Sequence, residues 1–374
     1  MACEEVANMA NQKRAPDYIL LILILSLLVI GMIMVYSASA AWATYRFDDS
    51  FFFLKRQLFF AGLGIFAMFF IMNIDYWTWK SLAKMMVIVC FILLIIVLIP
   101  GVGLVRGGAQ SWLGVGAFSI QPSEFMKMAM IVFLAKFLSE NQKHITSFKK
   151  GLVPSLSIVM LAFGMIMMQP DLGTGAVMVG TSVVMIFVVG ARISHFVMLG
   201  LIGLAGFAGL IISAPYRIKR ITSFLDPWED PLGSGFQIIQ SLYAIGPGGL
   251  MGMGLGESRQ KYFYLPEPQT DFIFAILAEE LGFIGGVIVL LLFAFVFWRG
   301  IRIALEAQDL FGSLLAIGII SMVAIQVMIN VGVVTGLIPV TGITLPLLSY
   351  GGSSLTLMLV SLGVLLNISK HSRI

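Results

Sequence analysis

Charged residues are scarce in this chain of 374 residues. Asp, Glu, Lys and Arg together make up 11% of the sequence, whereas hydrophobic residues make up 59%. This composition, with a mean hydropathy of +1.00, excludes a soluble globular protein. Apolar runs close to the ~20 residues that cross a bilayer recur along nearly the whole length. The sequence therefore predicts an integral, polytopic membrane protein whose helices satisfy their own backbone groups.

Histidine and cysteine are also rare. Cys3 lies in a polar N-terminal segment and Cys90 in an apolar run, so neither a disulfide framework nor a zinc-type spacing is predicted. His144, His195 and His371 fall at segment ends that we expect to face the cytoplasm. A nucleophile activated by histidine is therefore disfavoured on the outer face. The net charge of +4 follows membrane topology, and we expect no nucleic-acid partner.

Ten apolar segments are the candidate membrane spans of an all-α protein. The expected architecture is one ten-span membrane domain over residues 1–374, with a cytoplasmic tail at 1–17. The predicted spans are Tyr18–Ser37, Leu54–Met72, Leu82–Pro100, Pro122–Leu138, Pro154–Met168, Gly173–Gly190, Phe196–Ser213, Phe272–Trp298, Phe311–Leu337 and Thr341–Leu366.

The distribution of Lys and Arg indicates the orientation. With a cytoplasmic N-terminus, thirteen of the 23 basic residues lie on inner segments and ten on outer ones. The outer excess is concentrated in one long connection, and long loops count less in the positive-inside rule. We therefore expect both termini in the cytoplasm. A lesser alternative is that the outer basic residues bind an anion.

That long connection, residues 214–270, is an extracellular loop between the seventh and eighth spans. Its glycine cluster at 246–256 matches neither the P-loop nor the dinucleotide-binding spacing. Gly and Pro are better explained as permitting tight turns beside a substrate groove. We find no internal repeat of fixed period, which weakens an inverted-repeat transporter.

The stretch from Tyr262 to Gly282, YFYLPEPQTDFIFAILAEELG, places a carboxylate at the edge of an apolar span. An ionisable residue there, Asp271, is a functional candidate because a carboxylate is costly to bury in hydrocarbon. The alternative is a helix N-cap, a role that suits both Thr270 and Asp271. Deeper in the span are Glu279 and Glu280, one of which we expect to bond to a neighbouring helix or a buried water.

Further charges lie near predicted outer ends. Glu124 and Lys127, three residues apart on one helix face, form either an internal ion pair or the wall of a cavity. Asp171 is either an N-cap or a site carboxylate. Arg217 and Arg220 point the same way if their segment is helical, and contact either lipid headgroups or a phosphate. Carboxylates beside such cations suit the activation of a hydroxyl and the stabilisation of a departing anion, as with a phosphorylated lipid donor.

Five motifs in order resemble one family. QPSEFMK, QPDLGTG, PYRIKRITSFLDPWEDPLGSGFQIIQS, LPEPQTDFIFAILAEELG and GLIPVTGITLPLLSYGGSS are similar to the SEDS family of bacterial cell-wall polymerases, closest to its SpoVE/FtsW branch. The resemblance implies a fold like the GT-C transferases and a glycosyltransferase that polymerises lipid II on the outer face of the cytoplasmic membrane. It also implies a class B penicillin-binding protein, a transpeptidase, as partner.

The resemblance assigns roles to individual residues. Asp271 matches the essential aspartate, the general base that takes the proton from the acceptor sugar's 4-hydroxyl while undecaprenyl pyrophosphate leaves. Direct displacement predicts inversion at the anomeric carbon. Trp112 is either a sugar-stacking residue or an interfacial anchor, and Ser111 precedes it where many relatives carry a basic residue. The expected substrate-binding residues are Glu124, Lys127, Asp171, Arg217, Arg220, Glu267, Thr270 and Trp112.

Two other functions fit the same composition. A lipid II flippase would also be polytopic with cavity charges, but its ionisable residues should lie near the midplane. A non-catalytic scaffold for the penicillin-binding protein would tolerate changes at Asp271. A divalent cation, Mg²⁺ or Mn²⁺, is compatible with the chemistry, although no ligand spacing requires one. The sequence leaves open a role in division or in sporulation.

Overall fold

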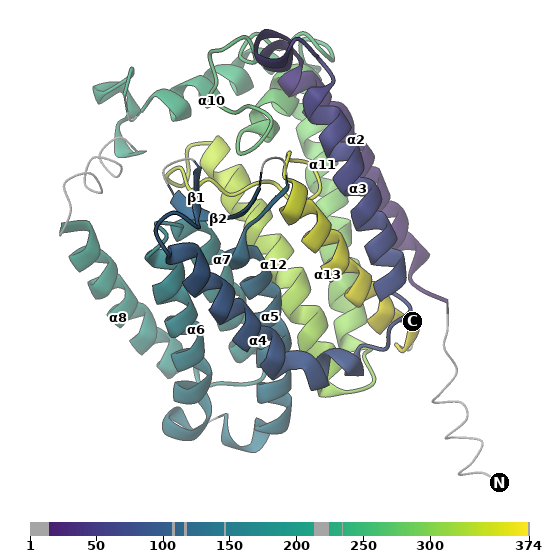
Figure 1. The fold of residues 1–374 in the computed structure, drawn as a ribbon, viewed down its shortest axis with the longest axis vertical. Coiled ribbons are helices and arrows are strands. Elements are labelled where there is room, and N and C mark those ends of the chain that lie inside the picture. The colour runs from purple at the N-terminus through teal and green to yellow at the C-terminus, as the bar shows by residue number, and fades with distance from the viewer. Residues whose placement is uncertain are drawn as a thin grey trace.

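The computed structural model describes residues 15–106, 109–115, 118–145, 147–212, 224–233 and 235–372. Within these residues the fold is a bundle of α-helices (Figure 1). The helices are α2 (Tyr18–Phe47), α3 (Phe52–Ile71), α4 (Trp77–Leu98), α5 (Pro122–Glu140), α6 (Val153–Met167), α7 (Leu172–Val188), α8 (Ile193–Ile212), α10 (Phe236–Gly248), α11 (Ile273–Leu305), α12 (Leu310–Val334) and α13 (Gly352–Lys370). Shorter turns are the 3₁₀ segments Gln142–His144 and Pro227–Glu229 and a π-helical segment, Phe148–Leu152.

Each predicted span overlaps one helix, and α10 is an additional helix inside the predicted outer loop. Of the described helices, six are long and apolar enough to cross a membrane: α2, α3, α4, α11, α12 and α13. The shorter apolar helices α6 and α7 pack beside them. The protein is a polytopic helical membrane protein, as the composition predicted.

Small residues let the helices approach closely. Gly363 of α13 faces the backbone of Met68 in α3, where a methyl group would lie 2.8 Å from the carbonyl oxygen. Gly31 of α2 similarly faces the carbonyl oxygen of Leu347, 2.4 Å from where its Cβ would stand. Such contacts suit membrane helices, whose association depends on close packing because lipid tails are as apolar as the side chains.

Three features differ from the sequence prediction. The segment between α4 and α5 forms a small antiparallel sheet of β1 (Leu104–Arg106), β2 (Ala109–Val115) and β3 (Phe118–Ile120), in the order β1-β2-β3. The last helix begins at Gly352, not Thr341, because residues 341–351 form a loop. Finally, α11 is broken at Gly282, whose φ of 67° is left-handed.

Both ends of the described chain lie at one end of the bundle. The backbone nitrogen of Asp17 donates to the Ser369 hydroxyl at 3.0 Å, and the Asp17 carboxylate pairs with Arg299 at 2.7 Å. Asp271 precedes the other end of the helix that carries Arg299, roughly 40 Å away at 1.5 Å per residue. Asp271 therefore lies at the opposite end of α11 from Asp17 and Ser369, which are near the two ends of the described chain; Figure 1 shows α11 running through the bundle.

Candidate active site

Asp271 does not cap a helix. Helix α11 begins at Ile273, and Phe272 at its N-cap position makes no side-chain hydrogen bond. The Thr270 hydroxyl donates instead to the carbonyl and carboxylate oxygens of Glu267, at 2.9 and 3.3 Å. The alternative that Thr270 or Asp271 serves as the N-cap is wrong, because the segment before the helix is held by other contacts.

Those contacts are made by three consecutive carbonyls. The Gln269 oxygen accepts from the Tyr350 backbone nitrogen at 2.8 Å. The Thr270 oxygen accepts from the Ser349 hydroxyl at 2.6 Å, and the Asp271 oxygen from the Asn330 side-chain nitrogen at 2.7 Å. The backbone before α11 is thereby fixed to α12 and to the loop at 341–351.

The Asp271 carboxylate faces a glycine in that loop. Its Oδ2 atom lies 3.7 Å from the position that a Cβ would take on Gly342, whose φ is +75°. No residue in the described part of the chain donates a hydrogen bond to this carboxylate. Burial and then the negative charge of Glu267 raise the pKa of Asp271 to about 7. A carboxylate with this pKa is well matched to accepting a proton near neutral pH.

Glu124 and Lys127 form the predicted ion pair. The Lys127 Nζ atom lies 2.8 Å from Glu124 Oε1, and their side chains are only 3% and 11% exposed. The Ser354 hydroxyl at the start of α13 donates to the other Glu124 oxygen at 3.1 Å. The internal ion pair is confirmed, and a contact of this pair with substrate stays a prediction.

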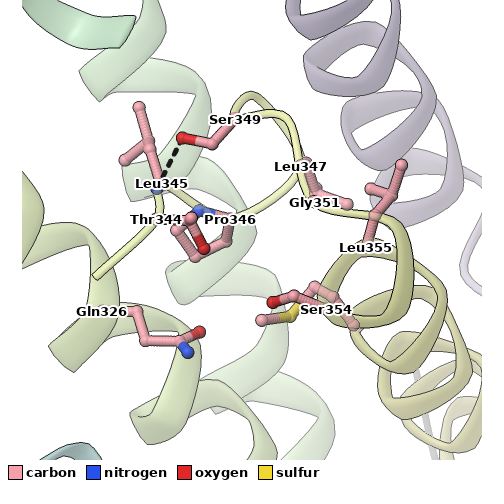
Figure 2. A pocket seen from close by; sticks show the side chains of 10 residues that line it. Gln326, Thr344, Leu345, Pro346, Leu347, Ser349, Gly351, Ser354 and Leu355 are labelled. Atoms are coloured by element: carbon pink, nitrogen blue, oxygen red, sulfur yellow. Dashed lines mark hydrogen bonds between the residues drawn. The ribbon is translucent and has the colours of Figure 1, made fainter. Parts of the chain in front are cut away.

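A small polar cavity lies between the ion pair and the Asp271 segment. Its volume of about 10 Å³ is lined mainly by residues 344–358 and by Gln326 of α12 (Figure 2). Ser349 and Ser354 both face it, and these hydroxyls bond to Thr270 and to Glu124 respectively. The volume suits about one water molecule, so the cavity as it stands is too small for a sugar.

Asp171 is the N-cap of α7. One carboxylate oxygen accepts from the Thr174 backbone nitrogen at 3.1 Å, and the other accepts from Gln121 at 2.8 Å and Ser123 at 3.2 Å. The alternative that this residue caps a helix is confirmed. Its carboxylate joins the starts of α5 and α7, and a direct contact with substrate stays a prediction.

The remaining predicted residues fall in two places. Trp112 lies on β2, opposite Leu104 of β1. Arg217 and Arg220 lie outside the residues that the structure describes. Among the described residues no group of three or more His, Cys, Asp or Glu side chains is placed to hold a metal ion. A divalent cation therefore stays a prediction too.

The sequence did not predict the buried network of hydrogen bonds and an ion pair beside the break in α11. Glu280 accepts from the Ser37 hydroxyl of α2 at 2.6 Å and pairs with Lys261 at 3.1 Å. Glu279 accepts from the Ser258 hydroxyl at 2.6 Å. One glutamate was indeed expected to bond to a neighbouring helix, but nothing in the sequence pairs Lys261 with it.

The glycine-rich segment packs against the same break. Backbone nitrogens of Met253 and Gly254 donate to the carbonyls of Glu279 and Glu280, at 2.9 and 3.0 Å. Gly252, with φ of +81°, lies so close to Glu280 that a Cβ would stand 2.1 Å from its carbonyl oxygen. The tight turns predicted for this cluster are confirmed for Gly252, Gly254 and Gly256, which have positive φ, whereas Gly246 and Gly248 lie in α10.

Comparison with known proteins places this geometry in context. Residues 18–374 match the family model for FtsW, RodA and SpoVE, described as a cell cycle protein. The chain is 75% identical over 365 residues to stage V sporulation protein E of Bacillus subtilis, covering 98% of this chain and 100% of that protein. It is 44% identical over 357 residues to a probable peptidoglycan glycosyltransferase FtsW of Geobacter sp. strain M18, covering 96% and 97%.

Solved structures share the fold. One comes from work on the structural coordination of polymerization and crosslinking by a peptidoglycan synthase complex, with a TM-score of 0.79 and 33% identity over 95% of this chain and 98% of that one. Another is the rod shape determining protein RodA of Thermus thermophilus, with a TM-score of 0.72 and 29% identity over 96% and 98%.

Proposed function

Because the chain belongs to the FtsW, RodA and SpoVE family, we propose that it is a peptidoglycan glycosyltransferase that polymerises lipid II in division or spore cortex synthesis. The observation that carries this proposal is the Asp271 carboxylate. It precedes a membrane helix, faces the space beside Gly342, and has a pKa raised to about 7. That is the property a general base requires, and a non-catalytic scaffold does not need it.

In the proposed reaction Asp271 accepts the proton of the acceptor sugar's 4-hydroxyl. The hydroxyl oxygen attacks the anomeric carbon of the donor while the bond from that carbon to the pyrophosphate oxygen breaks. Undecaprenyl pyrophosphate leaves as a stable anion, so no second carboxylic acid is needed, in contrast to glycoside hydrolysis. The single displacement inverts the anomeric configuration. Arg217 and Arg220 remain our candidates for contacts with the pyrophosphate.

We propose that the site faces outward and that both termini are cytoplasmic. The structure supports the relative arrangement, because Asp17 contacts Ser369 at the end of the bundle opposite Asp271. The Lys and Arg distribution supports the absolute orientation. We further propose a class B penicillin-binding protein as partner, since a similar structure comes from a peptidoglycan synthase complex.

The experiment that tests this function is glycan-chain formation from purified lipid II. The protein is assayed alone and with its co-expressed penicillin-binding partner, and lipid II movement across vesicles is measured with the same preparation. We expect glycan polymer to form, and we expect no more lipid II translocation than in vesicles without the protein. Translocation without polymer in either preparation would replace the polymerase by a flippase, and the absence of both would leave a scaffold.

A further inference from the structure

The hydrogen-bonded carbonyls of Gln269, Thr270 and Asp271 distinguish Asp271 from an ordinary carboxylate at the start of a helix. Two of their donors are side chains on different elements, Asn330 on α12 and Ser349 in the loop before α13. Both side chains are buried, with exposed fractions of 1% and 5%. A buried carbonyl needs a partner, but Asn330 and Ser349 do more than satisfy one group each.

Each side chain also binds the segment that faces Asp271. The Asn330 amide nitrogen donates its second hydrogen to the Ile343 carbonyl at 2.7 Å, so both of its hydrogens are used. The Ser349 hydroxyl accepts from the Leu345 backbone nitrogen at 2.8 Å (Figure 2). Gly342, which faces the Asp271 carboxylate, directly precedes this bonded segment. The two side chains therefore hold both segments beside the carboxylate, namely the one that carries Asp271 and the one that follows Gly342.

We propose that Asn330 and Ser349 are positioning residues for the general base, an inference that rests on the proposed polymerase. They orient Asp271 through its backbone, and none of the residues that the structure describes donates to its carboxylate. A donor placed directly on the carboxylate would stabilise the charged form and lower the pKa. Orientation through the main-chain carbonyls holds the carboxylate in place and keeps it basic, which a proton acceptor at neutral pH requires.

The magnitude of the effect follows from geometry. A displacement of a reacting group by about 1 Å costs on the order of 10²-fold in rate. Loss of the Asn330 bonds frees the Asp271 carbonyl and the Ile343 carbonyl together, so we expect at least a roughly tenfold fall in kcat. A loosened carboxylate also gains water, which moves its pKa back toward the ordinary value.

The chain offers a matched control in Asn367. This asparagine is also 1% exposed, and it bridges two backbone groups, donating to Met72 O and accepting from Tyr76 N at 2.9 Å each. It lies on α13 near the chain's C-terminal end, remote from Asp271. A purely structural role for a buried bridging asparagine would act alike at both positions.

The experiment compares Asn330→Ala, Ser349→Ala and Asn367→Ala, each purified with the partner protein. It measures thermal unfolding, kcat and KM for lipid II, and the pH dependence of kcat. We expect all three to lose stability, but only the Asn330 and Ser349 variants to lose kcat beyond their folded fraction. In those two variants the rise of kcat with pH should also begin at lower pH, and KM for lipid II should change by less than about twofold.

Three outcomes decide the inference. The expected split between the site variants and Asn367→Ala supports it. The inference is overturned if the activity of Ser349→Ala, or of any Asn330→Ala protein that folds, falls only with the folded fraction and its pH profile is unchanged. The proposed polymerase function would still stand after that result. A wild-type protein that makes no polymer under the same conditions removes the proposed function, and the inference with it.

Discussion

The Oδ2 atom of Asp271 lies 3.7 Å from the position that a methyl carbon would occupy on Gly342. The glycine φ of +75° is left-handed, a conformation that other residues adopt at a cost of about 1–2 kcal/mol. Gly342 thus keeps the space in front of the carboxylate open. The relationship links two segments about seventy positions apart in the sequence, and under the proposed function it predicts that a single methyl group hinders the approach of an acceptor hydroxyl to Asp271.

Replacement of that glycine tests the open space directly. We expect Gly342→Ala to lower kcat roughly tenfold or more, because the methyl group takes up space directly beside the carboxylate. Gly336→Ala is the matched control, since Gly336 has a φ of +73° and its Cβ would lie 3.7 Å from Ile238, an apolar neighbour. Both variants should lose similar stability in thermal unfolding. Equal loss of kcat in the two would show that backbone strain, and not the space at Asp271, explains the effect.

The pKa of Asp271 predicts how activity depends on pH. A base must be ionised to accept a proton, so kcat should rise with pH through about 7 and then level off. The native state holds this proton more tightly than the unfolded chain, so the raised pKa makes folding less favourable as pH increases from 3.8 to about 7. Polymer formation and unfolding, measured between pH 3.8 and about 7, test both predictions: activity should rise with pH and stability should fall.

The negative charge of Glu267 contributes to that raised pKa. Glu267→Gln removes the charge while keeping an oxygen that can accept from Thr270. We expect the pKa of Asp271 to fall and the acid limb of the kcat profile to move to lower pH. Glu257→Gln, elsewhere in the same connection, serves as the control. A limb that stays in place in Glu267→Gln would remove Glu267 from the electrostatics of the base.

The buried Lys261–Glu280 pair should matter for stability. Removing one partner of a buried ion pair leaves an uncompensated charge and costs about 3–5 kcal/mol. We therefore expect Lys261→Ala to lower the unfolding temperature strongly. Adding Glu280→Gln should recover much of the loss, because glutamine can still bond to Ser37 without the charge. A double variant as unstable as Lys261→Ala alone would contradict this account of the network.

Two variants of Asp171 distinguish its role as an N-cap from a contact with substrate. Asparagine is as good an N-cap as aspartate, so we expect Asp171→Asn to keep the capping part of the stability that Asp171→Ala loses, about 1–2 kcal/mol, although its amide nitrogen cannot accept from Gln121 and Ser123 as the carboxylate oxygen does. Thermal unfolding of the two variants checks this order. The KM of Asp171→Asn for lipid II then tests the predicted substrate contact, which needs the negative charge. An unchanged KM would leave capping as the role of this residue.

The sequence predicted the helices well because each span must satisfy its own backbone bonds over an apolar run. It failed at residues 341–351, which are apolar but form a loop. Hydropathy cannot distinguish a buried helix from a buried loop whose polar groups are paired by distant side chains. Gln57 of α3 is one such side chain, since it donates to the Ser349 carbonyl at 3.0 Å and accepts from the Gly351 nitrogen at 3.2 Å.

The site was predicted in part. Asp271 was singled out as a candidate from its depth, and Glu124 with Lys127 from their spacing, both of which are local properties. Asn330, Ser349 and Lys261 were missed because their partners lie 13 to 79 positions away in the sequence. Asn330 did carry a signal, as one of two amides, with Gln326, in the apolar run of α12. Polar side chains in membrane helices commonly bond to a neighbouring segment.

The central claim is that the Asp271 carboxylate is the base of a glycosyl transfer. The most direct measurement is polymer formation from lipid II by Asp271→Asn, purified with its partner and compared with Asp49→Asn, a half-buried aspartate that pairs with Lys55 in the turn between α2 and α3. We predict that Asp271→Asn folds and binds the partner but forms no glycan polymer, while Asp49→Asn polymerises as the wild type does. Polymer formed by Asp271→Asn at a rate close to that of Asp49→Asn would contradict the account.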